Sequence, residues 1–151
     1  MIASNDITIL IADDDADDRD LTQRGLRAAR VSNDVRFVAD GVELLDYLNR
    51  RGRYADPASA PMPGLILLDL QMPRRDGFAA LLEIRSTPVL RSLPIIVLTT
   101  SAADRDILRS YDLGVNSYIT KPVTFSGLVE AMQAIGNYWF HIVALPSRTE
   151  P

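Results

Sequence analysis

Five polar side chains lie at or directly behind the ends of segments that the sequence pattern predicts as strands. They are Asp13, Asp14, Asp69, Thr99 and Lys121. Because the carboxyl ends of parallel strands meet at one edge of a sheet, we expect these side chains to lie close together. Three neighbouring carboxylates repel one another unless a hard cation lies between them, and Mg²⁺ prefers oxygen ligands and often shares its shell with a phosphate. A carboxylate can then attack phosphorus while metal, lysine and hydroxyl neutralise the phosphoryl oxygens.

Each of these residues also has an ordinary structural interpretation when it is taken alone. An aspartate behind a strand can cap the next helix or turn, a threonine can bond to the backbone, and a lysine can be a surface charge. The segment 13–20 holds six aspartates, and four of them are expected to cap or solvate the first turn of a helix: Asp15, Asp17, Asp18 and Asp20. The chemical interpretation therefore depends on the complementary set occurring together at separate strand ends.

Short apolar segments alternate with helical patterns along the whole chain. The strands are predicted at 7–12, 35–39, 65–68, 95–98 and 116–120. Apolar residues at helical spacing are expected to face the core, among them Leu21, Leu82, Leu108, Tyr111 and Phe125. Between the second and third strands, the segment 49–64 loses both periodicities and is rich in proline and arginine, so a long surface loop is predicted there.

This alternation predicts an α/β fold with helices on both faces of a five-stranded parallel sheet. Right-handed crossover connections leave few arrangements, of which the flavodoxin-like, doubly wound order 2-1-3-4-5 suits this length.

Composition excludes several classes of function. The 151 residues suit one domain, the net charge is -4, and no Lys/Arg-rich run exists for binding nucleic acid. The absence of cysteine excludes thiolate chemistry, and the single histidine, His141, excludes multi-histidine metal sites. Neither a secretory signal nor a bilayer-spanning apolar stretch is present, so a cytoplasmic protein without a membrane partner is expected. No glycine-rich nucleotide-binding motif occurs.

Over about residues 7–135 the chain resembles the receiver domain of two-component response regulators. The resemblance rests on the five polar residues above and on the Met72-Pro73 and Asp76-Gly77 turn behind Asp69. It implies that Asp69 is the phospho-acceptor, that Thr99 is the switch hydroxyl and that Lys121 contacts the phosphoryl oxygens. The bond between Lys121 and Pro122 is expected to be cis.

The same resemblance implies a Mg²⁺ site and a switching mechanism. Asp14, Asp69 and the backbone carbonyl of Gln71 are expected to bind the metal directly, and Asp13 mainly through water. Tyr118 matches the switch aromatic, which turns inward when Thr99 moves to the phosphoryl group. A sensor histidine kinase is the implied donor, and the face formed by the fourth helix, fifth strand and fifth helix is expected to change its affinity for partners.

Three features differ from a minimal receiver. Thr100 follows the switch threonine where a smaller residue is common and, with Gln71, is expected to alter the lifetime of the phosphoryl group. The aromatic tail, Tyr138-Trp139-Phe140, predicts either packing onto the domain or an association surface, and we favour a homodimer. We therefore divide the chain into a receiver domain, 1–137, with an extended C-terminal helix, and an extension, 138–151.

This tail, the long loop 49–64 and the Leu98-Thr99-Thr100-Ser101 run together resemble those of single-domain regulators that partner phytochrome-type histidine kinases. The resemblance implies a bacteriophytochrome as the kinase. Two other functions remain open at this point. A phosphatase or flavin protein with the same fold is one, although a haloacid-dehalogenase-like phosphatase would require Asp-x-Asp where Asp69-Leu70-Gln71 stands. A scaffold that is never phosphorylated is the other.

Overall fold

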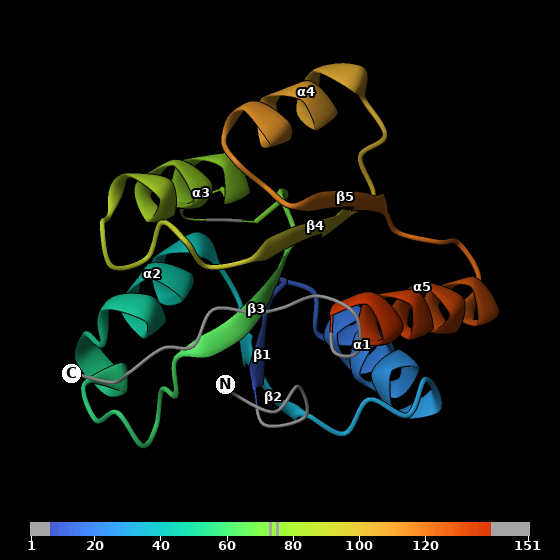
Figure 1. Cartoon of the computed structure of the whole chain (residues 1–151), viewed down its shortest axis with the longest axis horizontal. Coiled ribbons are helices and arrows are strands. Elements are labelled where there is room, and N and C mark those ends of the chain that lie inside the picture. The colour runs from blue at the N-terminus through green and yellow to red at the C-terminus, as the bar shows by residue number, and fades with distance from the viewer. Residues whose placement is uncertain (1–6, 73, 75, 140–151) are drawn as a thin grey trace.

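The computed structural model describes residues 7–72, 74 and 76–139 and shows one parallel sheet covered by helices on both faces (Figure 1). The strands are β1 (Thr8–Ala12), β2 (Asp34–Val38), β3 (Pro63–Leu68), β4 (Ile95–Thr99) and β5 (Ser117–Thr120), in the order β2-β1-β3-β4-β5. The helices are α1 (Ala16–Ala28), α2 (Gly41–Asn49), α3 (Gly77–Ser86), α4 (Asp104–Asp112) and α5 (Phe125–Asn137). The predicted flavodoxin-like order is confirmed.

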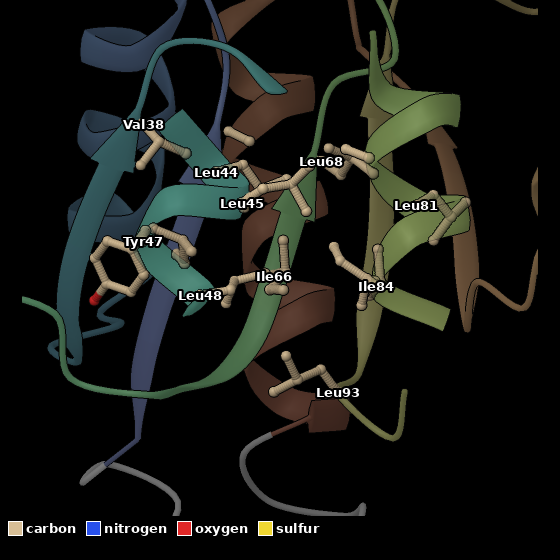
Figure 2. Packing of buried hydrophobic residues seen from close by; sticks show 14 of the residues in the cluster. Val38, Leu44, Leu45, Tyr47, Leu48, Ile66, Leu68, Leu81, Ile84 and Leu93 are labelled. Atoms are coloured by element: carbon tan, nitrogen blue, oxygen red, sulfur yellow. The ribbon is translucent and has the colours of Figure 1, made fainter. Parts of the chain in front are cut away.

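The two faces of the sheet carry separate hydrophobic cores because side chains alternate along each strand. Leu10, Ile66 and Val97 face α2 and α3, whereas Ile9, Leu67 and Ile96 face α1 and α5. Figure 2 shows the first core, in which residues of α2 and α3 converge on Ile66 and Leu68 of β3. The central strands are therefore buried on both faces, as their continuous apolar sequences predict.

Polar side chains at the N-termini of four helices fix where those helices begin. Asp15, Asp40, Asp76 and Thr124 each accept a hydrogen bond from a backbone N–H in the first turn of α1, α2, α3 and α5. Each satisfies a donor that has no partner within its helix. Gly77 is required behind Asp76, because a Cβ there would lie 2.6 Å from the Cα of Leu70.

Several core predictions were wrong. The side chains of Leu21, Leu82, Leu108, Tyr111 and Phe125 are between 39% and 64% exposed. In α4, Ser110 is the buried residue, and its hydroxyl donates to the backbone of Asp106 instead of requiring solvent. The sheet therefore contacts a narrower stripe of these helices than their apolar residues occupy.

The segment 49–64 is more ordered than the predicted surface loop. It contains a 3₁₀ helix, η2 (Gly52–Tyr54), and it buries Tyr54 and Ala60 against the first core. The third strand begins at Pro63, two residues earlier than predicted, because Pro63 pairs with Thr8 of β1.

The described residues include no cis peptide bond, so the expected cis bond between Lys121 and Pro122 is wrong for this structure. The tertiary amide before proline favours trans by only about 0.5–1 kcal/mol, so local contacts decide the isomer. At the other end of α5, Trp139 packs into the second core, and the tail from 140 onward lies outside the described residues. Within the described part of the chain, no helix is long and apolar enough to cross a membrane.

Candidate functional site

The strand ends bring all five predicted polar residues to one edge of the sheet. Asp13 follows β1, Asp69 follows β3, Thr99 ends β4 and Lys121 follows β5. Backbone hydrogen bonds fix these positions, since Asp69 donates its N–H to Ala12 and Lys121 donates to Thr99. The parallel pairing of the strands thus brings residues that are far apart in the sequence together in one cluster.

Lys121 lies at the centre of this cluster. Its ammonium donates to Asp13 at 2.8 Å, to Asp18 at 3.1 Å and to Asp69 at 3.2 Å. Its side chain is only 12% exposed, so solvent screens these interactions weakly. The lysine therefore compensates carboxylates that would otherwise repel one another across the sheet edge.

Asp69 has partners for both of its carboxylate oxygens. Oδ2 accepts from Lys121, while Oδ1 accepts from the Thr99 hydroxyl at 3.1 Å and from the Gln71 N–H at 3.0 Å. Thr99 is fully buried and Asp69 is 8% exposed. A cation, a hydroxyl and a backbone donor therefore surround one carboxylate, which is the arrangement that a phosphoryl group attached there would need.

The pKa shifts of Asp13 and Lys121 show opposing effects of burial and pairing. Burial raises the pKa of Asp13, and its hydrogen bond from Lys121 offsets only part of this effect. Burial alone would lower the pKa of Lys121, but the hydrogen bond to Asp13 and the charge of Asp69 outweigh it and raise that pKa well above its usual value. At neutral pH Lys121 is therefore charged, and its hydrogen bond partly offsets the cost of burying the Asp13 carboxylate.

The donor set of this cluster fits a hard divalent cation. Carboxylate oxygens of Asp13, Asp14 and Asp69 lie within 4.8 Å of one another, and Asp14 is exposed. Oxygen ligands with an open side to water suit Mg²⁺, which keeps several of its own waters. The expected division into direct and water-mediated ligands, and the role of the Gln71 carbonyl as a ligand, stay predictions.

A chain of contacts leads from Thr99 toward α4 and β5. Ser101 accepts a hydrogen bond from the Tyr118 hydroxyl on its carbonyl at 2.8 Å, and its own hydroxyl bonds to Asp106 at 2.6 Å. Tyr118 is half-buried against the first core, and burial raises the pKa of its phenol. The predicted switch aromatic thus contacts the loop that follows the predicted switch hydroxyl.

Gln71 and Thr100 lie next to each other on the exposed side of the site. The Thr100 hydroxyl bonds to the side-chain oxygen of Gln71 at 3.3 Å. Their contact brings together the two positions expected to influence the phosphoryl lifetime, which itself stays a prediction.

Two parts of the site were missed by the sequence interpretation. Asp18, expected to be a solvated helix residue, pairs with Lys121, and Arg19 donates to the backbone carbonyl of Asp13 at 2.8 Å. The spacing of five and six residues from Asp13 places both on the first turns of α1 that face the site, a signal hidden among the other aspartates. The ion pair between Arg74 and Asp40 was not predicted either.

Comparison with known proteins agrees with this geometry. The family model of the response regulator receiver domain matches residues 9–133. The chain belongs to the response regulator receiver family. Response regulator Rcp1 of Synechocystis sp. is 36% identical over 141 residues, which cover 93% of this chain and 93% of Rcp1.

Solved structures of receiver proteins superpose closely on this one. A phosphorylated cyanobacterial phytochrome response regulator, RcpA, shares 41% identity with a TM-score of 0.87, and the match covers 94% of this chain and 99% of RcpA. Response regulator RPA3017 of R. palustris red light signaling shares 37% identity with a TM-score of 0.89, again over 94% and 99% of the two chains. A structure of Rcp1 with bound Mn²⁺ has a TM-score of 0.84 at 35% identity and covers 93% of this chain and 99% of Rcp1.

Proposed function

We propose that this receiver accepts a phosphoryl group on Asp69 from a phosphohistidine of a sensor histidine kinase. The observation that carries this proposal is the environment of Asp69, which has Lys121 on one oxygen and Thr99 on the other. Family membership supports the reaction class, and the acidic cluster supports a Mg²⁺ requirement.

In the proposed step, a carboxylate oxygen of Asp69 bonds to phosphorus while the bond between phosphorus and the histidine nitrogen breaks. The histidine keeps that electron pair and the phosphoryl group becomes an aspartyl phosphate. Lys121 neutralises charge on the transferred oxygens, and the Thr99 hydroxyl donates to one of them. Asp14, Asp69 and the Gln71 carbonyl would hold Mg²⁺, with Asp13 acting through water, and the bound ion would supply further positive charge at those oxygens.

The proposed response to phosphorylation runs through the contacts behind Thr99. A phosphoryl oxygen competes with the Asp69 carboxylate for the Thr99 hydroxyl, and Ser101 connects that hydroxyl's loop to Tyr118 and to Asp106 of α4. The exposed side chains of Leu108, Tyr111 and Phe125 lie on α4 and α5, where a change in this loop alters the surface offered to a partner.

The cellular role is proposed from the relatives. Because RcpA is a phytochrome response regulator and RPA3017 acts in red light signaling, we propose a bacteriophytochrome-type kinase as the donor and the cytoplasm as the location. We further propose that the protein acts as a homodimer, and that it is a signalling protein whose only catalytic role is to assist its own phosphorylation and dephosphorylation.

Intact mass after incubation with Mg²⁺ and acetyl phosphate tests the proposal. We expect one added phosphoryl group on the wild-type protein, none in the presence of a chelator and none on Asp69→Asn. Asp20→Asn is the matched control, because Asp20 forms only an exposed ion pair with Arg24 among the contacts described. Modification of Asp69→Asn, or no modification of the wild type together with no beryllofluoride complex, would exclude the mechanism.

A further inference from the structure

Two interactions fix the loop that carries the acceptor: a backbone hydrogen bond between its two ends and an ion pair of Arg74. We call residues 69–77 the acceptor loop. At its base, Gly77 donates its N–H to the Leu70 carbonyl at 3.0 Å. Near its tip, Arg74 has a φ of 62°, in the left-handed region that a side chain such as arginine adopts at a cost. Surrounding contacts must therefore maintain this conformation.

Arg74 supplies such a contact through an ion pair with Asp40. Its Nε lies 2.7 Å from Oδ2 and its Nη2 lies 3.0 Å from Oδ1, so the guanidinium binds the carboxylate through two parallel hydrogen bonds. Most exposed ion pairs contribute little, but a two-point arginine–carboxylate pair fixes direction as well as distance. Only 12% of the Asp40 side chain is exposed, so one partner is nearly removed from solvent.

Asp40 is itself held rigidly by α2. Its Oδ1 accepts the Glu43 N–H at 2.8 Å as the helix cap, and Glu43 Oε2 accepts the Ala39 N–H at 3.3 Å in return. The other oxygen of Glu43 accepts the hydroxyl of buried Tyr54 at 2.7 Å. Burial opposes ionisation of Asp40, but the hydrogen bonds from Arg74 and Glu43 outweigh it and lower the Asp40 pKa. The carboxylate is therefore a fixed, charged anchor at neutral pH.

We propose that Arg74 is a positioning residue for the phosphoryl-transfer reaction: its ion pair with Asp40 fixes the acceptor loop and thereby sets the affinity of the acidic cluster for Mg²⁺. This inference rests on the proposed function above. Gln71, whose carbonyl is an expected metal ligand, lies three residues before Arg74 in the same loop. A ligand that is fixed before binding loses less conformational freedom when the metal arrives, so anchoring the loop strengthens binding. Arg74 contacts neither the acceptor nor the expected metal ligands in the described structure.

Calorimetric titration with Mg²⁺ and hydrogen exchange of the metal-free protein test this proposal together. For Arg74→Gln we expect a dissociation constant for Mg²⁺ that is about tenfold higher, the scale seen when residues supporting metal ligands are lost. We also expect faster exchange of acceptor-loop amides with unchanged exchange in β1 and β4. Arg51→Gln is the matched control. Arg51 lines the same pocket as Arg74, but its ion pair is with Asp46 and is exposed. This variant should leave both readouts unchanged.

Three further variants separate the effect of the ion pair from the effects of backbone conformation and of stability. Asp40→Asn keeps a side chain that caps α2 but removes the charge, and it should weaken Mg²⁺ binding as Arg74→Gln does. The double variant should be no weaker than either single one, since both remove the same interaction. Arg74→Gly permits the positive φ without the side chain and should also bind Mg²⁺ weakly.

Wild-type Mg²⁺ affinity in Arg74→Gln, or in Arg74→Gly, would overturn the proposal, as would exchange that is unchanged in the acceptor loop. These outcomes are distinct from failure of the proposed function, in which the wild-type protein itself would not be phosphorylated on Asp69. A uniform rise in exchange across the sheet would show a general loss of stability and would also contradict a positioning role.

Discussion

At the scale of single residues, the site holds three carboxylates that repel one another when all of them are charged. Asp13 is 3% exposed and its raised pKa means that the folded protein disfavours the charged carboxylate relative to the unfolded chain. The hydrogen bond from Lys121 lowers this pKa, but the effect of burial is larger. The charged form of a residue in the proposed Mg²⁺ site therefore lowers the stability of the metal-free protein.

This conflict makes a prediction for Asp13→Asn. In metal-free buffer at pH 7 the variant should unfold at a higher temperature than the wild type, because asparagine resembles the neutral form that burial favours. Added Mg²⁺ should stabilise it less, since each tenfold loss of affinity removes about 1.4 kcal/mol of stabilisation by a saturating ligand. Thermal unfolding with and without Mg²⁺ checks both parts, and a lower unfolding temperature without metal would contradict the first.

Sequence allowed the residues at strand ends to be predicted, but not those that reach the site from elsewhere. Asp13, Asp69, Thr99 and Lys121 are placed by the register of the sheet, which apolar patterns reveal. Asp18 reaches Lys121 because α1 begins at Ala16 and turns this carboxylate toward β5, which depends on how the helix packs. Among six neighbouring aspartates, residue type alone does not identify the one with this contact.

At the scale of elements, one arginine joins α3, the start of β4 and the turn after α4. Arg85 donates to the backbone carbonyls of Arg91 and Leu93 at 2.9 and 2.8 Å, and to Gly114 at 3.0 and 2.7 Å. Burial lowers the pKa of this guanidinium, and the bonds described here are all to carbonyls. Arg85 therefore supplies hydrogen-bond donors to backbone carbonyls in loops, which lie outside the strand pairing of the sheet.

Replacing Arg85 by methionine should lower the free energy of unfolding by about 2–3 kcal/mol, because three carbonyl groups lose donors. Arg85→Lys should recover part of the loss, since an ammonium still donates but reaches fewer acceptors. Urea unfolding measures the change. Phosphorylation of Asp69 serves as the control and should be unaffected, because Arg85 lies at the opposite end of β4 from Thr99.

The connection between α2 and β3 makes a prediction about pH. The Tyr47 hydroxyl donates to the Pro61 carbonyl at 2.7 Å, and burial raises the Tyr47 pKa to about 12. Between pH 10 and 12 the unfolded chain ionises this phenol while the folded protein keeps it protonated, so stability falls as pH rises. Over this range the loss approaches about 2.7 kcal/mol.

Tyr47→Phe should lack this loss. At pH 8 the variant should be less stable than the wild type by about 1 kcal/mol, since the Pro61 carbonyl loses its donor. The difference should shrink above pH 10 and reverse toward pH 12. Urea unfolding of both proteins from pH 8 to 11.5 checks this, and a constant difference across the range would show that Tyr47 ionises alike in both states.

Which face of each helix is buried was the feature predicted least well from the sequence. In α4 the apolar residues Leu108 and Tyr111 suggested an inward face, yet both are exposed and Ser110 is buried. The reason is that β5 is an edge strand, which covers α4 over a narrow stripe around Ser110. Amphipathic spacing identifies an apolar face, but it does not show whether that face meets the core or remains free for a partner.

At the scale of the whole molecule, the two neighbouring aromatics at the end of α5 have opposite environments. Trp139 is 7% exposed within the second core, whereas Tyr138 is 53% exposed. Their rings meet edge to face with centroids 5.6 Å apart. Trp139 therefore packs onto the domain, whereas an association surface at exposed Tyr138 stays a prediction.

This pair makes a matched prediction. Trp139→Ala should destabilise the protein by about 3–4 kcal/mol, because it leaves a cavity in the second core. Tyr138→Ala should change stability by less than about 0.5 kcal/mol. If the proposed homodimer uses this end of the molecule, Tyr138→Ala should weaken self-association in sedimentation velocity without lowering the unfolding temperature. Equal destabilisation by both variants would contradict the packing described.

The overall architecture followed from the sequence because buried parallel strands leave a strong apolar signal and right-handed connections leave few orders. The segment 49–64 did not, because Tyr54 and Ala60 enter the core through contacts with α2 that have no periodicity. Order in that segment arises from packing against distant residues and not from any local pattern.

The sheet separates two hydrophobic cores that share no residue. Helices α1 and α5 cover one face of the sheet and α2 and α3 cover the other (Figure 1), and each face has its own hydrophobic core. Because the two cores share no residue, we expect a substitution in the helices of one layer to leave the side-chain contacts of the opposite layer in place. The side chains at the strand ends are the exception. Their positions depend on strands that pack against both cores, so we expect a change in either layer that shifts a strand to affect them together.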